Sequence, residues 1–213
     1  DAQEVAALEQ PRHPRCRVAL VQRHAEVEVR PTEAHREFEG PRLPLVIDDA
    51  VHVDVADVAE VQEALDRLRG VFTELVPALE DTGTVVALEP LAPSETDVLN
   101  TAAVTREVIA GIGSPHVRLH LDVKAMSSEA EPIPGIIRAS AADLEHFHAN
   151  DANLRGPGFG SVDFGPIFAA LGEVDYRGWV SVEVFDYAPG PERAARESIA
   201  YMRGVEAGLA ARR

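Results

Sequence analysis

Hydrophobic residues fall into a regular helical pattern from Val58 to Gly83. They recur every three or four positions, as on one face of an α-helix. The apolar positions are Val61, Leu65, Leu68, Val71, Phe72, Leu75 and Leu79. The next residues, TVVAL at 84–88, are mostly β-branched and apolar, which is typical of a strand buried on both faces of a sheet. The pattern therefore predicts a long amphipathic helix and then a strand that ends on Glu89 and Pro90.

Strands and helices alternate four times between this point and the C-terminus. The further predicted strands are 117–123, 144–147 and 178–185, and the further predicted helices are 97–112, 133–142, 164–174 and 192–211. The strand at 144–147 delivers His148, Asn150 and Asp151 where it stops, and the Gly/Pro-rich segment 153–160 then excludes a regular element. Repeated βα units predict a parallel sheet. A series of this length favours one α/β fold, the TIM (β/α) barrel.

The N-terminal third carries a weaker pattern. Residues 1–45 are poorly patterned, with short strand-like runs only at 17–22 and 27–30, while 45–56 alternates well enough for a strand. Eight βα units take about 250 residues, and only 83 residues precede Thr84. We therefore expect one TIM barrel domain over 1–213 with an incomplete or shortened N-terminal half. Because the chain begins at Asp1, it reads as a fragment or a processed product.

An incomplete barrel leaves strand edges that need partners. The predicted strand at 84–88 can pair with 45–56, and the strand at 178–185 can pair with a strand from 17–30. Because bare strand edges invite aggregation, loops or a second chain should cover what remains open. A homodimer is one way to achieve this.

Composition narrows the class of protein. The 213 residues are 46% hydrophobic, which is enough for one sizeable core. The formal net charge of -16 opposes binding to nucleic acid or to an anionic membrane surface. Since no apolar run reaches the roughly 18 residues of a membrane span and no signal peptide is visible, we expect a cytoplasmic protein with a small-molecule substrate.

Each of the four well-patterned strands ends near a side chain that can bind a metal ion. They are Glu89, Asp122, His148 and Glu183. One acidic residue at a strand end is usually structural or solvated, but function in a (β/α) barrel gathers at these ends, and here four strands in succession supply one. Three carboxylates with one imidazole make a hard, oxygen-rich site. Such a site suits one Mn²⁺, Mg²⁺ or Co²⁺ ion better than Zn²⁺.

Four sequence strings resemble the xylose isomerase-like TIM barrel superfamily, which includes sugar isomerases and epimerases. They are ALEPLAPSET at 87–96, LHLDVKAMSSE at 119–129, HFHANDANLRGPGFG at 146–160 and VSVEVF at 180–185, so residues 84–203 carry the family motifs. The resemblance implies that Glu89, Asp122, His148 and Glu183 bind one divalent metal and that Glu89 and Glu183 also move protons. It further implies that Glu95 lies near the substrate.

Two positions depart from the family pattern, and both concern the substrate. Ala125 stands where many relatives have a substrate-binding histidine, and the arginine often found six residues after the metal histidine is shifted by one, to Arg155. Lys124 lies two residues beyond Asp122, so strand alternation points it toward the barrel mouth, where it can replace the missing histidine. We assign Lys124, Arg155, Asp151 and Glu95 to substrate binding.

These groups suit a proton shift beside a carbonyl. A metal can act as a Lewis acid that stabilises an enediolate, while one carboxylate removes a proton and another returns it. A dehydratase acting on a cyclic polyol would use the same groups, and a truncated barrel without activity would retain the motifs. A DNA-repair endonuclease of the same superfamily, which uses a cluster of zinc ions held by additional histidines, fits less well, because the chain is acidic and lacks a histidine-rich set at the other strand ends.

Overall fold

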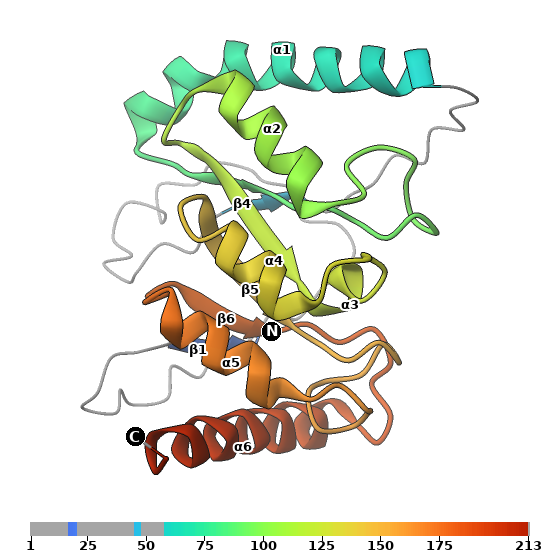
Figure 1. Cartoon of the computed structure of the whole chain (residues 1–213), viewed down its shortest axis with the longest axis vertical. Helices are drawn as coiled ribbons and strands as arrows, with labels where there is room; N and C mark the ends of the chain where they lie inside the picture. The colour runs from blue at the N-terminus through green and yellow to red at the C-terminus, as the bar shows by residue number, and fades with distance from the viewer. Residues whose placement is uncertain (1–16, 21–44, 48–57, 213) are drawn as a thin grey trace, which may run out of the picture.

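The computed structural model describes residues 17–20, 45–47 and 58–212, and its core is a curved parallel sheet (Figure 1). In this part of the chain, six strands form one sheet in the order β1-β6-β5-β4-β3-β2, and all neighbours are parallel. The strands are β1 Arg17–Leu20, β2 Leu45–Ile47, β3 Val86–Leu88, β4 Val117–Asp122, β5 Leu144–Ala149 and β6 Trp179–Val182. The predicted parallel α/β architecture is thus confirmed.

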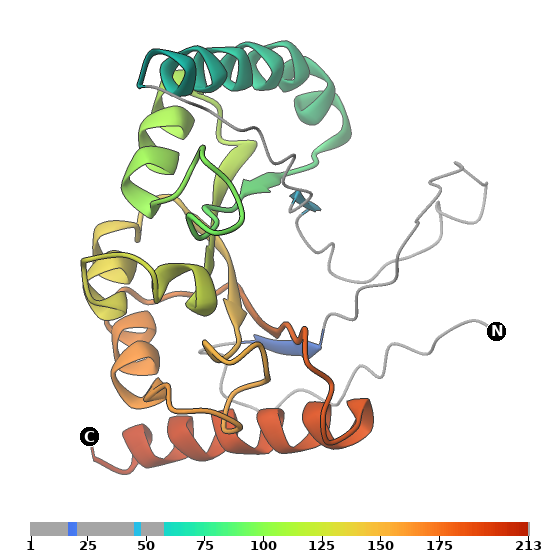
Figure 2. The ribbon, with the colours of Figure 1, turned by 90° about the vertical axis from the view of Figure 1, so that its right-hand side faces the viewer.

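The helices lie along the outer side of the curved sheet (Figure 2). They are α1 Val58–Thr82, α2 Ala102–Ile112, α3 Val123–Met126, α4 Ile133–Ala139, α5 Phe164–Glu173 and α6 Pro191–Ala210. Parallel strands need crossover connections, and α2, α4 and α5 lie within those that join β3 to β4, β4 to β5 and β5 to β6. Each helix predicted from the sequence is present, with ends that shift by a few residues.

Helix α1 shows how its apolar stripe is used. Leu65 and Phe72, two turns apart, are buried in the core, whereas Val71 and Leu75 stay 55% and 42% exposed. The predicted stripe was therefore too wide. The physical reason is that α1 packs against α2, its neighbour on the sheet, so one side of the stripe is covered and the other is not covered by described residues.

The two faces of the sheet carry different chemistry. Successive residues of a strand point to opposite faces. In β4 and β5, Leu119, Leu121 and Phe147 belong to the hydrophobic core, while the alternate positions are polar and equally buried. The alternate residues are His120, Asp122, His146 and His148. Burial on both faces is what the apolar strand pattern predicted, but one face buries ionisable groups.

The edges of the sheet match the pairing expected from the strand count. β2 pairs with β3, and β1 pairs with β6. Within the described residues the hydrogen-bonded order ends at β1 on one side and at β2 on the other. The predicted strand at 27–30 lies outside the described residues, and so do positions 48–56 of the strand predicted at 45–56.

One short helix was not predicted. The expected strand 117–123 stops at Asp122, and α3 begins at Val123. The cause is local, because the Asp122 carboxylate accepts a hydrogen bond from the Ala125 backbone N–H at 2.8 Å and so caps the helix. Lys124 therefore lies on a helix, and strand alternation does not set its direction.

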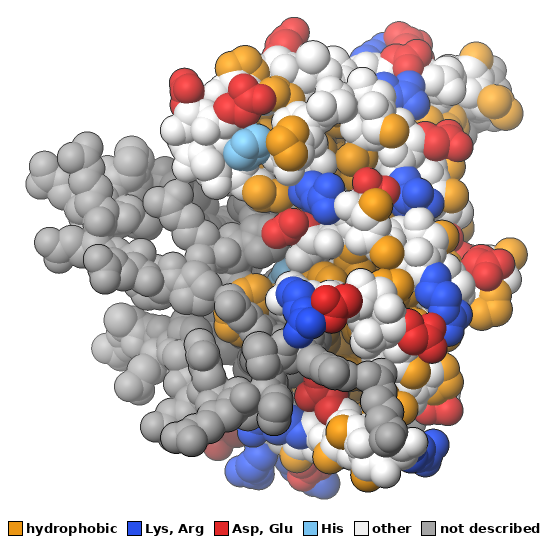
Figure 3. Space-filling model, turned by 60° about the vertical axis from the view of Figure 1, so that its left-hand side comes forward, with side chains coloured by type: hydrophobic (Ala, Val, Ile, Leu, Met, Phe, Trp, Pro, Cys, Tyr) orange, Lys and Arg blue, Asp and Glu red, His pale blue; other side chains and the backbone are white. Residues whose placement is uncertain are grey.

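The surface drawn in Figure 3 carries both signs of charge. Lys and Arg side chains are interspersed with Asp and Glu side chains over its described part. Ion pairs between the described residues, such as Arg106 to Asp143 at 2.9 Å and Arg138 to Glu173 at 2.7 Å, join charges of opposite sign. A basic stripe is the usual mark of a nucleic-acid site, and this face does not carry one in its described part. Among the helices that the structure describes, none is long and apolar enough to cross a membrane.

Candidate metal centre

Four neighbouring strands bring the predicted ligands together at their C-terminal ends. Glu89 follows β3, Asp122 ends β4, His148 lies in β5 and Glu183 follows β6. The register pairs Asp122 directly with His148 across β4 and β5. One ligand atom from each of the four residues lies within 4.8 Å of the others, and all four side chains are buried. Residues separated by nearly a hundred positions thus meet at one point.

The donor set fits a hard divalent cation. Around an octahedral ion with bonds of about 2.1 Å, opposite ligand atoms are about 4.2 Å apart, close to the spread of these side chains. Three carboxylates and one imidazole are the oxygen-rich mixture that Mn²⁺ or Mg²⁺ accepts. The residues present therefore fit the ion that the sequence implied.

Electrostatics also favour a cation at this point. Burial, with the carboxylates of Glu89 and Glu183 nearby, raises the pKa of Asp122 to about 7. Burial lowers the pKa of His148, but the surrounding carboxylates, Glu183 foremost, outweigh it and raise that pKa above its ordinary value. Buried carboxylates that repel one another need a positive charge among them. A proton on His148 supplies one positive charge, and a divalent cation would supply two.

Asn150 holds the ligands in place, and sequence reasoning gave it no role. Its side chain is fully buried, and Nδ2 donates to Asp122 Oδ2 at 2.6 Å and to Glu183 Oε2 at 3.5 Å. Its Oδ1 accepts from the Lys124 backbone N–H at 2.8 Å. The signal in the sequence was its spacing, because Asn150 lies two residues after His148 and the alternation of a strand continues that far.

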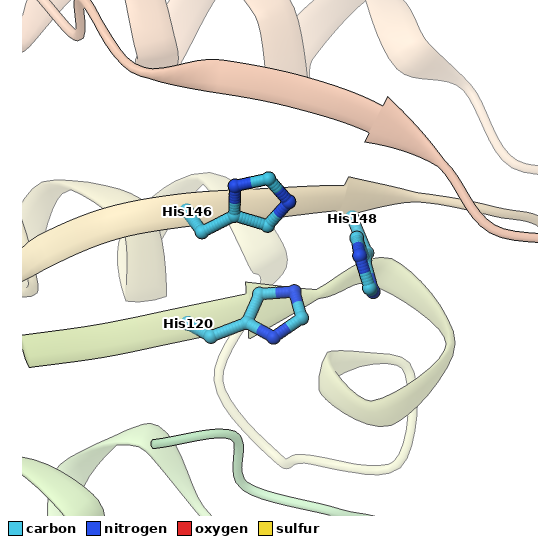
Figure 4. Close-up of side chains that lie close together, drawn as sticks. All are labelled: His120, His146 and His148. Atoms are coloured by element: carbon cyan, nitrogen blue, oxygen red, sulfur yellow. The ribbon is translucent and has the colours of Figure 1, made fainter. Parts of the chain in front are cut away.

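Two further histidines lie directly beside the ligand set (Figure 4). His120 of β4 and His146 of β5 each precede a predicted ligand by two residues and share its face. His120 Nδ1 is 3.2 Å from Glu89 Oε2, and the rings of His120 and His148 are 4.0 Å apart at their centroids. Burial is the main reason that the pKa values of His120 and His146 fall below the ordinary range. Their spacing of two residues before Asp122 and His148 is the sequence signal that identifies both histidines.

Lys124 and Glu95 meet close to the metal centre. Lys124 Nζ donates to Glu95 Oε1 at 2.6 Å and stands 4.4 Å from the centroid of the Phe185 ring. The two residues were predicted separately as substrate-binding, and the structure joins them in one ion pair. Lys124 is tied to the ligand set through its backbone, since Asn150 binds both its N–H and Asp122.

Asp151 and Arg155 lie in the loop that follows β5. The buried Asp151 carboxylate accepts from the backbone N–H groups of Ser161 at 3.3 Å and Val162 at 3.1 Å, which closes the loop. Arg155 Nε donates to Asp186 Oδ2 at 2.8 Å, which links the loop to the segment after β6. In the structure both predicted substrate-binding side chains thus contact the protein itself.

A model of the family described as xylose isomerase-like TIM barrel matches residues 42–205. Among curated proteins, the chain is 32% identical over 144 residues to 3-dehydro-D-guloside 4-epimerase of Escherichia coli (strain K12), covering 66% of this chain and 55% of that protein. It is 33% identical over 127 residues to D-psicose 3-epimerase of Agrobacterium fabrum, covering 59% and 44%. The chain thus spans about half the length of these curated relatives.

Solved structures give the same result. The 3-keto-D-glucoside 4-epimerase of E. coli in its apo form superimposes with a TM-score of 0.62 at 30% identity, over 71% of this chain and 56% of that one. D-psicose 3-epimerase in the presence of D-fructose gives 0.62 at 25% identity, over 72% and 58%. With its parallel sheet, its strand-end ligand set and a family match over most of its length, the chain belongs to the xylose isomerase-like TIM barrel family.

Proposed function

We propose that this chain carries the metal-binding part of a carbohydrate epimerase or isomerase that moves a proton beside a carbonyl group. The observation that carries the proposal is the convergence of Glu89, Asp122, His148 and Glu183 within 4.8 Å. The names of the related proteins specify sugar epimerases, which supports a ketose or a keto-sugar as the substrate class. A buried site with two glutamates beside one ion meets the needs of such a reaction.

Glu89 and Glu183 are the proposed acid and base. They follow β3 and β6, which flank β4 and β5, so the two carboxylates approach the ligand cluster from opposite sides. A substrate between them can lose a carbon-bound proton to one glutamate and gain a proton from the other, through an enediolate. Addition of the proton to the opposite face of the carbon inverts its configuration.

The remaining side chains hold this arrangement. A bound Mn²⁺, Mg²⁺ or Co²⁺ ion supplies Lewis-acid stabilisation of negative charge on the substrate oxygens. Asn150 orients the Asp122 carboxylate through its hydrogen bond of 2.6 Å. We propose that the Lys124 and Glu95 pair contacts substrate hydroxyl groups. Asp151 and Arg155 keep the loop after β5 in position and bring it to the substrate.

The test is deuterium exchange from solvent into candidate ketoses by Mn²⁺-loaded protein. We expect exchange at a carbon beside the carbonyl, and a loss of about 10²- to 10⁴-fold in Glu183→Gln, which removes the proton-transfer group. Glu107→Gln is the matched control, because Glu107 lies exposed on α2. Circular dichroism confirms that each variant is folded.

The products separate the proposed reaction from its rivals. An epimer or an isomer as product supports the proposal. Loss of water from a cyclic polyol would assign the site to a dehydratase instead. Protein that binds Mn²⁺ but exchanges no proton in any ketose would show that this chain is an inactive part of a barrel.

We also propose that the chain forms a homodimer. In the described residues, β1 and β2 are the end members of the sheet order, and unpaired strand edges favour association. Light scattering should give the mass of a dimer. A stable monomer would show that other parts of the chain protect the edges.

A further inference from the structure

Three buried imidazoles form a second cluster, which shares His148 with the predicted ligand set (Figure 4). His120 comes from β4, and His146 and His148 come from β5. One ring nitrogen from each lies within 4.8 Å of the others, and the exposed fractions of the three residues are 0%, 2% and 3%. The ring centroids are 4.0 to 5.1 Å apart, and the rings meet edge to face. Only His148 belongs to the predicted ligand set.

The nitrogens of His120 and His146 lack hydrogen bonds. Both ring nitrogens of each of these two residues are buried without a hydrogen-bond partner in the structure, whereas His148 Nδ1 lies 3.5 Å from Glu183 Oε2. Buried polar atoms nearly always have a partner, and each exception needs an explanation such as an ion or water. The approach of His120 Nδ1 to Glu89 Oε2 at 3.2 Å lacks the alignment of a hydrogen bond. Four such atoms in one place point to a missing ligand.

We propose that His120, His146 and His148 form a second metal site, which binds a borderline transition metal ion such as Zn²⁺. Three neutral nitrogen donors select such an ion over Mg²⁺ or Mn²⁺, and three histidines with an open fourth position are a known zinc geometry. Bonds of about 2.0 to 2.1 Å place the nitrogens of a tetrahedral ion about 3.3 Å apart. The widest separation must therefore close by up to about 1.5 Å, which rotation of the rings can provide.

Sharing His148 couples the two sites. A dication at the histidine cluster lies within a few ångströms of a dication at the carboxylate cluster, and like charges at that distance repel strongly where water is excluded. Both ions also draw on one imidazole. Zn²⁺ at the histidines therefore weakens binding of Mn²⁺ at the carboxylates, and Mn²⁺ weakens binding of Zn²⁺ by the same factor. This holds whatever reaction the chain performs.

X-ray absorption of wild-type protein with one equivalent of Zn²⁺ tests the site without any mutation. We expect scattering from three imidazoles. A spectrum with one imidazole and an otherwise oxygen shell would place the zinc among the carboxylates and overturn the proposal.

Titration of two variants with Zn²⁺ and Mn²⁺ gives a second, independent measurement. His146→Gln should lower Zn²⁺ affinity by more than about tenfold, since even indirect contacts to a metal are worth that much, and leave Mn²⁺ affinity unchanged. Glu183→Gln should lower Mn²⁺ affinity and leave Zn²⁺ affinity unchanged. His116→Gln is the control, because His116 is only half-buried and its Nδ1 is 2.8 Å from Thr84 O. Zinc affinity that falls in Glu183→Gln but not in His146→Gln would refute the second site.

Discussion

Asn150→Ala tests whether a side chain that touches no substrate determines the geometry of the metal centre. The substitution removes the donor to Asp122 at 2.6 Å and the acceptor for the Lys124 N–H at 2.8 Å. It leaves the Asp122 carboxylate buried, with the Ala125 N–H still donating to it at 2.8 Å, and opens a small cavity. We expect losses of both stability and metal affinity.

The expected loss of stability follows from the two hydrogen bonds that the substitution removes. A hydrogen bond to a charged acceptor contributes about 1.5 to 3 kcal/mol. Lys124 N–H is one of the first donors of α3, and loss of a helix cap costs about 1 kcal/mol. The sum is about 3 kcal/mol, which in a protein of this size lowers Tm by about 6 to 12 °C. Metal affinity should fall by about 10- to 100-fold, as it does when a group that orients a ligand is lost.

Thermal unfolding of metal-free protein and Mn²⁺ titration measure the two effects separately. Asn153→Ala is the matched control, because Asn153 is exposed and bonds only to loop backbone, at Phe159 O and Arg155 N. It should cost about 1 kcal/mol or less and leave metal affinity unchanged. If Asn150→Ala behaves like this control, the hydrogen bond to Asp122 does not order the site.

Two further predictions concern the loop and the response to pH. In Gly160→Ala, the new Cβ would stand 2.1 Å from Asp151 Cγ, so we expect thermal unfolding to show a loss of stability of about 1 to 3 kcal/mol. The control is Gly204→Ala, which has open space around it on α6 and should be neutral or stabilising. Equal effects of the two substitutions would show that the clash is not the cause. Burial raises the pKa of Asp122 from 3.8 to about 7, so between these values the metal-free fold holds a proton that the unfolded chain has released, and stability is lost as pH rises from about 4 to about 7. Tm without metal should therefore fall from about pH 5 to about pH 7, Mn²⁺ should raise Tm more at pH 7 than at pH 5, and an equal fall in Asp122→Asn would contradict this.

The sequence by itself determined the main helices and strands, and which polar side chains stand at the strand ends. Helical spacing and continuous apolar strands are local signals, because they reflect which face of each element leaves water. Strand β3 was predicted at 84–88 and lies at Val86–Leu88, and β5 extends the predicted 144–147 to Ala149. Since parallel strands place their C-terminal ends at one edge, Glu89 and Glu183 could be assigned to one site from strand order alone.

Only the tertiary structure decided what these residues contact. The register that sets Asp122 opposite His148, the Asn150 bridge and the His120 ring beside His148 all join residues more than twenty positions apart. The Asp151 carboxylate was predicted from the same loop to bind substrate, yet its hydrogen bonds go to backbone N–H groups ten and eleven residues later. A local pattern says which side chains are polar, but the partners of a buried polar group depend on which other segments pack against it.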